Sequence, residues 1–257
     1  MATKVDPITL DIIENALKNA RFEMDGVVVR ISLSPVIREQ HDEFPMICNE
    51  RGQMVVGQFG SYIPSVVEKF GGDVNEGDIF VWNDPYASKG SISHNNDWCV
   101  MLPIFHEDVL VGFSSIFGHM VDVGGSVPGS MPANARTIWE EGLRVPPVKI
   151  YEKGVLNQGV LDIMLNNSRT PDMNRADLMA LIAGCKTAST RVRELCDRFG
   201  RETYMTACDM LLDRTRGAMR QVICKYIPEE PVSFTDYVDD DGLGNGPFKM
   251  TLTISRR

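Results

Sequence analysis

Histidines and acidic residues stand together at three points in the first half of the chain. The sequence contains four histidines, and three of them have an aspartate one or three positions further on, in His41-Asp42, His94-x-x-Asp97 and His119-x-x-Asp122. Imidazole nitrogens and carboxylate oxygens bind divalent cations when they converge to about 2.0–2.3 Å from the ion. Two His-x-x-Asp units that enter from neighbouring strand ends would supply such a donor set.

A purely structural interpretation of these residues stays open. A lone His-x-x-Asp pair arises often by chance, and no helix fixes its geometry as in the His-Glu-x-x-His metal motif. On this interpretation, each His-x-x-Asp pair is a partly buried histidine held by a nearby carboxylate. The charged run 37–42, which follows Ser34-Pro35, is likewise typical of a solvated loop.

Glycine and proline are dense in residues 118–147, immediately around the third of these units. A long loop of this kind inside a folded domain is usually functional, so Gly124 and Gly125 are candidates for binding a substrate or an anion. A tight structural turn is the alternative. The sequence has no G-x-x-x-x-G-K-[ST] motif, no G-x-G-x-x-G after a strand and no G-x-S-x-G, so it indicates neither a nucleotide site nor a serine hydrolase.

The elements that must position these residues follow from hydrophobic periodicity. Asp6-Pro7 is a typical helix start, and apolar spacing predicts a helix to about Val27. The chain then turns to strands, and side chains at strand ends commonly form sites. The predicted strands are 44–48, 54–56, 79–82, 98–105 and 109–117.

Two amphipathic helices follow Pro171, with a break at Gly200, and predict a helical hairpin. Alternation resumes in 232–237 and 248–254 and predicts two further strands, which need a covering partner because a two-stranded ribbon is marginal alone. The fold class is therefore α+β: an N-terminal helix, mixed strands with a long ordered loop, a helical hairpin and the start of a β segment. The predicted units are an α/β metal-site domain, the helical hairpin and the β segment, at 1–170, 171–228 and 229–257.

The composition excludes several classes of protein. The chain has 257 residues, of which 43% are hydrophobic and 24% charged, as in ordinary globular proteins. No apolar run approaches the roughly 18–20 residues of a membrane span, and no signal segment is visible, so we expect a cytoplasmic protein. The net charge of −9 argues against nucleic acid as a partner. Six cysteines without a C-x-x-C pair predict buried, reduced thiols.

Ordered motifs along nearly the whole chain resemble the hydantoinase B family. This family includes the B subunits of N-methylhydantoinase, the corresponding part of 5-oxoprolinase, and subunits of acetone and acetophenone carboxylases. The segments that carry the resemblance are Asp6–Leu10, Ile37–Glu39 with Asp42, Gly77–Asp78, Asn83–Tyr86, His94-x-x-Asp97, His119–Gly125, Pro128–Pro132, Glu141–Lys149, Asn167–Pro171 and Asp239–Gly242.

The resemblance implies a divalent metal ion, either manganese, zinc, iron or magnesium, with Glu39, His94, Asp97 and His119 as ligands. It implies catalytic roles for His119 and Asp122, with Asp122 as a further ligand or as the group that orients His119. The ion would act as a Lewis acid on a carbonyl or enolate oxygen, or would lower the pKa of a bound water. ATP would be bound and cleaved by a separate hydantoinase-A-like subunit.

Three functions remain open within this resemblance. The first is a subunit of an ATP-dependent enzyme that hydrolyses a cyclic amide such as a hydantoin, oxoproline or a lactam. The second is a subunit of an ATP-dependent ketone carboxylase of the acetone or acetophenone type. The third is a non-catalytic structural subunit of such a complex, which the apolar helices and the unfinished ribbon would suit.

Two departures from the family pattern concern the substrate rather than the metal. The family often has His-Leu-Pro-Asp where this chain has His94-Asn95-Asn96-Asp97, and often has histidines near the position of Tyr62-Ile63-Pro64. The chain resembles the N-terminal half of a full-length family subunit. We therefore expect a second chain to supply the C-terminal half.

Overall fold

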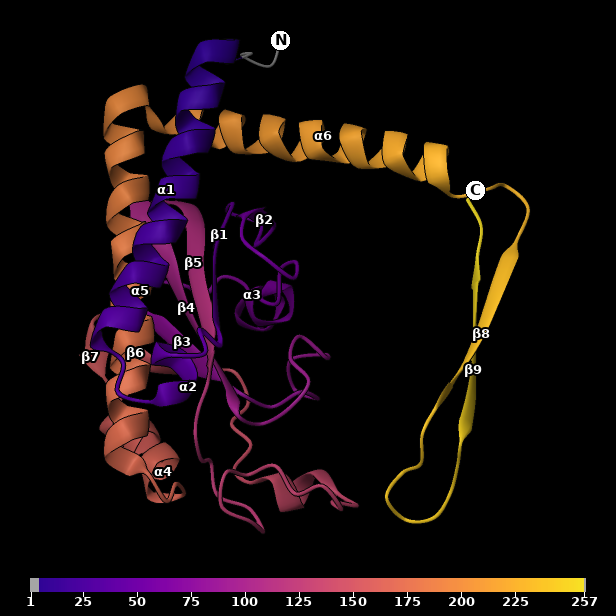
Figure 1. The fold of residues 1–257 in the computed structure, drawn as a ribbon. Coiled ribbons are helices and arrows are strands. Elements are labelled where there is room, and N and C mark those ends of the chain that lie inside the picture. Colours follow the sequence, from indigo (N-terminus) through magenta and orange to yellow (C-terminus); the bar gives the residue numbers. More distant parts are fainter. Residues whose placement is uncertain (1–4, 257) are drawn as a thin grey trace.

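A seven-stranded sheet in the order β2-β1-β5-β4-β3-β6-β7 forms the centre of the computed structural model, which describes residues 5–256 (Figure 1). Every neighbouring pair of strands in this sheet is antiparallel. The strands are β1 (Glu43–Cys48), β2 (Met54–Val56), β3 (Ile79–Trp82), β4 (Asp97–His106), β5 (Val109–His119), β6 (Val148–Glu152) and β7 (Val155–Leu156). The helices of this part are α1 (Pro7–Ile31), α2 (Pro35–Arg38), α3 (Pro64–Phe70), the 3-10 helix η1 (Ile138–Glu141), α4 (Gln158–Asn166) and α5 (Pro171–Phe199).

Helix α1 begins where the Asp6-Pro7 pair predicts it. The Asp6 carboxylate accepts hydrogen bonds from the backbone N–H groups of Ile8 and Thr9, and Pro7 occupies the first turn. The helix continues four residues beyond the predicted end, to Ile31. Its exit is then fixed by Asp177 of α5, whose buried carboxylate accepts hydrogen bonds from Leu33 N at 2.7 Å and Ser34 N at 3.2 Å.

The two faces of the sheet bury different sets of side chains. Along β4, Trp98, Val100 and Leu102 join the core with α1 and α5, while Cys99 and Met101 join a second core under α3. This alternation follows from the two-residue period of a strand. Both faces are covered, by α1 and α5 on one side and by α3 with its neighbouring loops on the other (Figure 1).

Helix α5 packs closely against the sheet at Gly184. A Cβ at this position would lie 2.6 Å from Ile116 Cδ1 and 2.8 Å from Val28 Cγ2, so only glycine allows α5 to approach both β5 and α1. Leu178 and Leu181 of α5 share one core with Ile13 of α1. The core therefore continues across the predicted boundary at residue 170.

The α+β class is confirmed, as are the predicted N-terminal helix and strands. Several short elements have no counterpart among the predictions: α2, α3, α4, η1, β6 and β7. Each contains too few residues to develop a clear period. Within the described chain, no helix combines the length and the apolar character of a membrane span.

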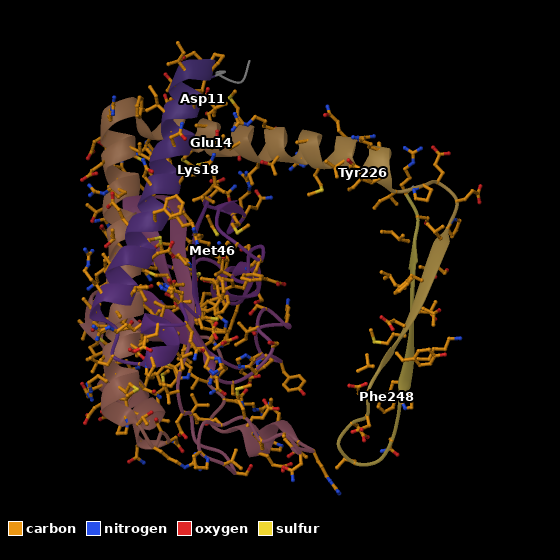
Figure 2. All side chains as sticks on the ribbon, in the orientation of Figure 1. Asp11, Glu14, Lys18, Met46, Tyr226 and Phe248 are labelled. Carbon is orange, nitrogen blue, oxygen red and sulfur yellow. The ribbon has the colours of Figure 1, made fainter. Side chains whose placement is uncertain are left out.

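Helix α6 (Arg201–Tyr226) leads away from α5 at Gly200 instead of running back along it (Figure 1). Its buried residues end at Leu211, and Arg214 pairs with Asp11 and Glu14 of α1. Beyond this point the helix is exposed and carries a separate two-stranded sheet of β8 (Val232–Val238) and β9 (Phe248–Ile254). Figure 2 shows Tyr226 and Phe248 on this projecting part, which we call the arm (residues 213–256).

The ribbon of the arm has one apolar and one polar face. The register pairs Phe234 with Leu252, and it pairs Thr235 with Thr251 on the opposite face. The hydroxyl groups of Thr235 and Thr251 lie 3.0 Å apart. All residues of both strands are exposed. The apolar face carries Val232, Phe234, Val238, Phe248, Met250, Leu252 and Ile254, and Asp236 opposite Met250 is its one charged residue.

The cysteines agree with the prediction of buried, reduced thiols in five cases out of six. None forms a disulfide, and only Cys224 on α6 is exposed. Burial raises the pKa of the Cys48, Cys185 and Cys208 thiols to about 12 in each case. These groups are therefore unreactive at neutral pH.

A buried acid lies where α1 meets β1. Glu43 is 4% exposed, and its Oε2 has no hydrogen-bond partner within residues 5–256. Burial, followed by the repulsion of the neighbouring Asp25 carboxyl, raises the pKa of Glu43 to about 8. Burial also raises the pKa of Asp25, although the Arg21 guanidinium 3.4 Å away opposes this.

We expect the free energy of unfolding to fall as the pH rises from about 4.5 to about 8. The unfolded chain releases the Glu43 proton at the lower value and the folded chain holds it up to the higher one, so the folded state binds more protons throughout this window. Glu43→Gln should flatten this dependence in denaturant titrations across the same pH range. The exposed Glu230 provides the control Glu230→Gln, and an unflattened slope in Glu43→Gln would contradict the expectation.

Candidate metal centre

The ladder between β4 and β5 brings together two residues that are far apart in the sequence. Asp97 is the first residue of β4 and His119 the last of β5, and the register places them directly opposite each other. The backbone N–H of His119 also donates to Asp42 O at 3.0 Å, where the chain enters β1. The ends of three adjacent strands, β1, β5 and β4, therefore meet at this point.

His94 joins this pair from the loop before β4. Its Nε2 lies 3.4 Å from one carboxylate oxygen of Asp97, and Nδ1 of His119 lies 3.4 Å from the other. The ring centroids of the two histidines are 5.1 Å apart. One ligand atom from each of His94, Asp97 and His119 can be chosen so that all lie within 4.8 Å of one another.

Buried amides hold the surrounding loops in place. Asn83 donates to the carbonyl oxygens of Asn95 at 2.6 Å and Leu143 at 2.8 Å, and its own Oδ1 accepts from Val145 N at 2.6 Å. Asn96 donates to Met120 O at 2.9 Å, next to His119. The residues between His94 and Asp97, and the residue after His119, are thus hydrogen-bonded to neighbouring loops.

The three side chains fit a divalent cation. Two ligand atoms on one ion are separated by roughly 3.0–3.4 Å when each bond is about 2.1 Å long. The two carboxylate-to-imidazole distances here are 3.4 Å, each to a different oxygen of Asp97, so both fit one ion when this carboxylate binds through both oxygens. Nδ1 of His94, the ring nitrogen that does not face Asp97, is buried and has no hydrogen-bond partner within the described chain, so this ring lacks the second contact that usually orients a metal-bound histidine. Two imidazoles and a carboxylate suit zinc, manganese and iron in particular.

Asp42 stands beside this cluster without belonging to it. Its Oδ2 lies 3.7 Å from Nδ1 of His119, and its side chain is 40% exposed. The contact involves the same ring nitrogen that faces Asp97, and it is too long for a hydrogen bond. The sequence indicates Asp42 through its position next to His41 and through the family motif of Ile37–Glu39 with Asp42.

Two other predicted site residues lie elsewhere. Glu39 follows the last residue of α2, is exposed, and does not belong to the group of converging ligand atoms. Asp122 is buried, and its carboxylate oxygens accept hydrogen bonds from Gly124 N, Gly129 N and Arg169. No hydrogen bond between Asp122 and His119 occurs in the described part of the chain, so the structure gives Asp122 a different partner from the predicted one.

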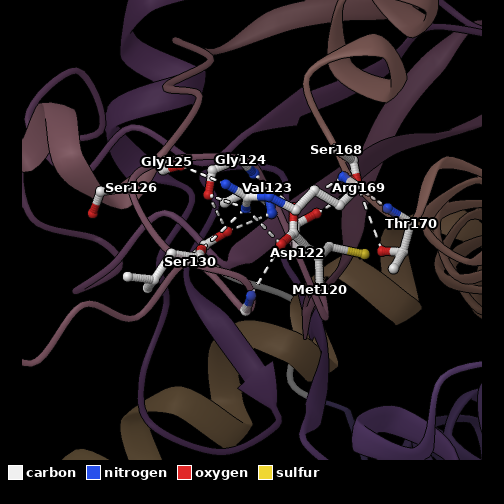
Figure 3. A network of polar contacts seen from close by, with 12 residues as sticks. Met120, Asp122, Val123, Gly124, Gly125, Ser126, Ser130, Ser168, Arg169 and Thr170 are labelled. Carbon is white, nitrogen blue, oxygen red and sulfur yellow. Dashed lines mark hydrogen bonds and ion pairs between the residues drawn. The ribbon is translucent and has the colours of Figure 1, made fainter.

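Arg169 is the partner that local spacing did not reveal. Its guanidinium pairs with Asp122 at 2.9 Å and donates to three carbonyl oxygens of the glycine-rich loop (Figure 3). These carbonyls belong to Gly124, Gly125 and Val127. Burial alone would raise the pKa of Asp122, but hydrogen bonds from the backbone and from Arg169 outweigh it and lower this pKa. The ion pair therefore fastens the loop that leaves the candidate centre.

Gly124 and Gly125 support this packing. A Cβ at Gly124 would lie 2.6 Å from Asn167 O, and one at Gly125 would lie 2.4 Å from Glu140 O. Both residues have positive φ angles, of 92° and 79°. Protein backbone occupies the space that the missing side chains leave, which favours the structural-turn interpretation over a bound anion.

Comparison with known proteins identifies the family. A model of the Hydantoinase B/oxoprolinase family matches residues 6–257. The chain belongs to this family, and the resemblance drawn from its motifs is confirmed.

Its relatives are parts of larger enzymes. The caprolactamase subunit beta of Pseudomonas jessenii is 33% identical over 98% of this chain and 44% of its own length. The acetophenone carboxylase delta subunit of Aromatoleum aromaticum is 28% identical over 96% of this chain and 37% of its own length. The crystal structure of the ATP-dependent caprolactamase from Pseudomonas jessenii superimposes with a TM-score of 0.91 and 31% identity, over 99% of this chain and 45% of that chain. The chain spans less than half the length of these relatives.

The Asp122–Arg169 pair predicts the effect of one substitution on stability. Asp122→Asn removes the charge from hydrogen bonds that are each worth about 1.5–3 kcal/mol, so we expect a loss of about 1–3 kcal/mol in unfolding free energy and faster amide exchange in the loop after His119. Asp108→Asn, at an exposed turn, should change neither quantity. Unchanged exchange in Asp122→Asn would show that the pair does not fasten the loop.

Proposed function

We propose that His94, Asp97 and His119 bind a divalent metal ion and that this chain is the metal-binding subunit of an ATP-dependent enzyme. The observation that carries the proposal is the convergence of the two imidazoles on opposite oxygens of one buried carboxylate. Such an ion supplies a Lewis acid at neutral pH. Asp97 lies 3.4 Å from one nitrogen of each ring, and Asp42 lies 3.7 Å from His119 on the third segment.

The reaction we propose is the ATP-dependent hydrolysis of a cyclic amide. This rests on the 33% identity to caprolactamase subunit beta, which extends over 98% of this chain. An unstrained amide is a poor electrophile, so cleavage benefits from activation of its carbonyl oxygen and from charge stabilisation at that atom. The sequence has no phosphate-binding glycine loop, and we therefore assign ATP to a separate hydantoinase-A-like subunit.

We further propose that the arm docks a polypeptide with the fold of the C-terminal half of these relatives. The likeness to the caprolactamase structure covers 99% of this chain, and more than half of that protein lies beyond it, since the match covers 45% of that chain. Seven apolar side chains on one face of the ribbon are exposed. A two-stranded ribbon of this kind becomes stable when its apolar face is covered.

An ATP-dependent ketone carboxylase is the second candidate. The match to the acetophenone carboxylase delta subunit, over 96% of this chain, favours it specifically. The same charge stabilisation at one oxygen would then serve an enolate in place of an amide.

Substitution of one ligand tests the metal site and the reaction together. In the complex purified with its partner subunits, we expect His119→Ala to lower bound metal at least about tenfold and to abolish ATP-dependent ring opening of a lactam. His106→Ala is the matched control, because His106 lies at the other end of β4 and pairs with Asp197 at 2.8 Å. Elemental analysis and product chromatography measure the two effects.

Retention of both metal and turnover in His119→Ala would overturn the proposed site. Metal-free complex with undiminished activity would identify a structural subunit instead. Incorporation of labelled bicarbonate into an acid product, with no ring opening, would identify the carboxylase.

The two faces of the ribbon allow a matched test of docking. Leu252→Glu places a charge on the apolar face, and Thr251→Glu places the same charge on the polar face of the same strand. We expect Leu252→Glu to lower co-purification of a chain with the C-terminal-half fold at least about tenfold, since burying an unpaired charge is costly, while Thr251→Glu retains it. Mass spectrometry identifies the associated chain. Equal loss in both variants, or a second copy of this chain as the bound species, would contradict the assignment.

A further inference from the structure

A largely buried arginine lies in the segment 142–145 without a hydrogen-bond partner. The Arg144 side chain is 19% exposed, and its guanidinium group makes no hydrogen bond to any residue in the range 5–256. In that range the one acid within 4 Å is Asp84, whose Oδ1 lies 3.9 Å from Nη1 of Arg144, beyond hydrogen-bond distance. This oxygen already accepts from the backbone N–H groups of Tyr86 and Ala87. A cation with five unused N–H donors is costly at such a place unless another group bonds it.

The terminal nitrogens of this guanidinium group are the atoms that a partner can reach. Nε of Arg144 is fully enclosed, whereas Nη1 and Nη2 are not. Two terminal nitrogens in one plane match the two oxygens of a carboxylate. The geometry therefore calls for an acidic group that the described chain does not provide.

Two exposed aromatic rings flank the same guanidinium group. Its central carbon lies 4.0 Å from the ring centroid of Trp139 and 5.7 Å from that of Tyr86. Trp139 is 71% exposed and Tyr86 is 70% exposed. Tryptophan, tyrosine and arginine are the residues that most often dominate the binding energy of protein interfaces. We call Tyr86, Trp139 and Arg144 the aromatic patch.

The backbone beneath the aromatic patch is held in one conformation. Oε1 of Glu140 accepts hydrogen bonds from the N–H groups of Arg136 and Thr137, at 3.0 Å each, and so fixes the helix η1 that carries Trp139. The backbone N–H of Ser126 donates to Glu140 O at 2.8 Å and attaches η1 to the glycine-rich loop. A surface that is already ordered loses little conformational freedom when a partner binds.

Asn83 connects the aromatic patch to the loop of the candidate metal centre. Its Nδ2 donates both to the carbonyl oxygen of Leu143, one residue before Arg144, and to that of Asn95, one residue after His94. A protein bound at the patch therefore adjoins the loop that supplies His94.

We propose that the aromatic patch docks the ATP-binding subunit, which presents an aspartate or glutamate side chain to Arg144 from within an apolar surface. The two exposed rings pack against that apolar surface and shield the ion pair from water. A small anion would bond Arg144 but would leave both rings exposed, so a polypeptide fits the patch better.

The position of the patch favours the ATP-binding subunit over other chains. An intermediate activated with ATP is lost to water while it diffuses, so the subunit that forms it benefits from lying next to the centre that consumes it. The arm, to which we assign the chain with the C-terminal-half fold, consists of other elements. The inference rests on the proposed function, which assigns ATP to a separate subunit.

Substitutions in the patch test this docking by the affinity of the chain for the ATP-binding subunit of its complex. We expect Arg144→Glu to lower that affinity at least about tenfold by like-charge repulsion, and Trp139→Ser to lower it by a similar factor. Trp139→Ser alters an exposed side chain, so it tests the interface even where Arg144→Glu perturbs folding. Phe22→Ser is the matched control, because Phe22 on α1 is 63% exposed and lies 5.6 Å from the guanidinium carbon of Arg21.

Unchanged affinity in Trp139→Ser, or an equal loss in Phe22→Ser, would overturn the docking proposal. Metal content measured on the same samples reports separately on the proposed function. Patch-dependent association of a chain that holds no metal would leave the docking standing while the metal site fails.

Tryptophan fluorescence tests the alternative of a small-anion site. Trp139 is exposed, whereas the other two tryptophans, Trp82 and Trp98, are fully buried, so changes in emission report on the patch. We expect inorganic phosphate or acetate to leave the emission of the full chain unchanged, because neither anion covers the rings. A saturable change that disappears in Arg144→Gln would identify a small-anion site and overturn the assignment to a protein partner.

Discussion

The register of the β4–β5 ladder is the constraint on which the candidate centre depends. It sets Asp97 opposite His119, and no loop conformation could substitute for it, because a shift of one residue would turn one of the two side chains to the other face of the sheet. The same shift would exchange Trp98 and Val100 with Cys99 and Met101 between the two cores. Core packing on both faces therefore fixes the register, and the geometry of the centre follows from burial of residues that take no part in it.

The loop before β4 supplies His94, the third residue of the candidate centre, and a few buried polar groups hold this loop and its neighbours in place. Asn83 ties the loop of His94 to the segment 143–145, and Arg169 ties the loop after His119 to the start of α5. Asp177, which lies in α5, accepts a hydrogen bond from the residue after α1 and holds the exit of that helix. Helix α5 thus packs against the strands and the helix that position the centre. Its close approach at Gly184 brings it against β5 and α1, and an added Cβ there would force Ile116 and Val28 to shift.

Sequence reasoning reached most of the strands, the long helices and the approach of His94-x-x-Asp97 to His119, because each has a local signature. It did not reach the partner of Asp122, since Arg169 is 47 positions away and only the packed loop selects it. Nor did periodicity indicate that α6 would leave α5: its apolar positions Met219, Val222 and Tyr226 read as a buried face, yet they are exposed here.

The distribution of thiols makes this protein chemically addressable at one point. Five cysteines are enclosed by the two cores and by the seam between α5 and α6, whereas Cys224 is exposed near the end of α6, where Arg256 donates to its carbonyl oxygen. An alkylating dye added to the folded chain would therefore mark the base of the ribbon alone. Cys224 is therefore a single attachment point for a spectroscopic label on the arm, away from His94, Asp97 and His119.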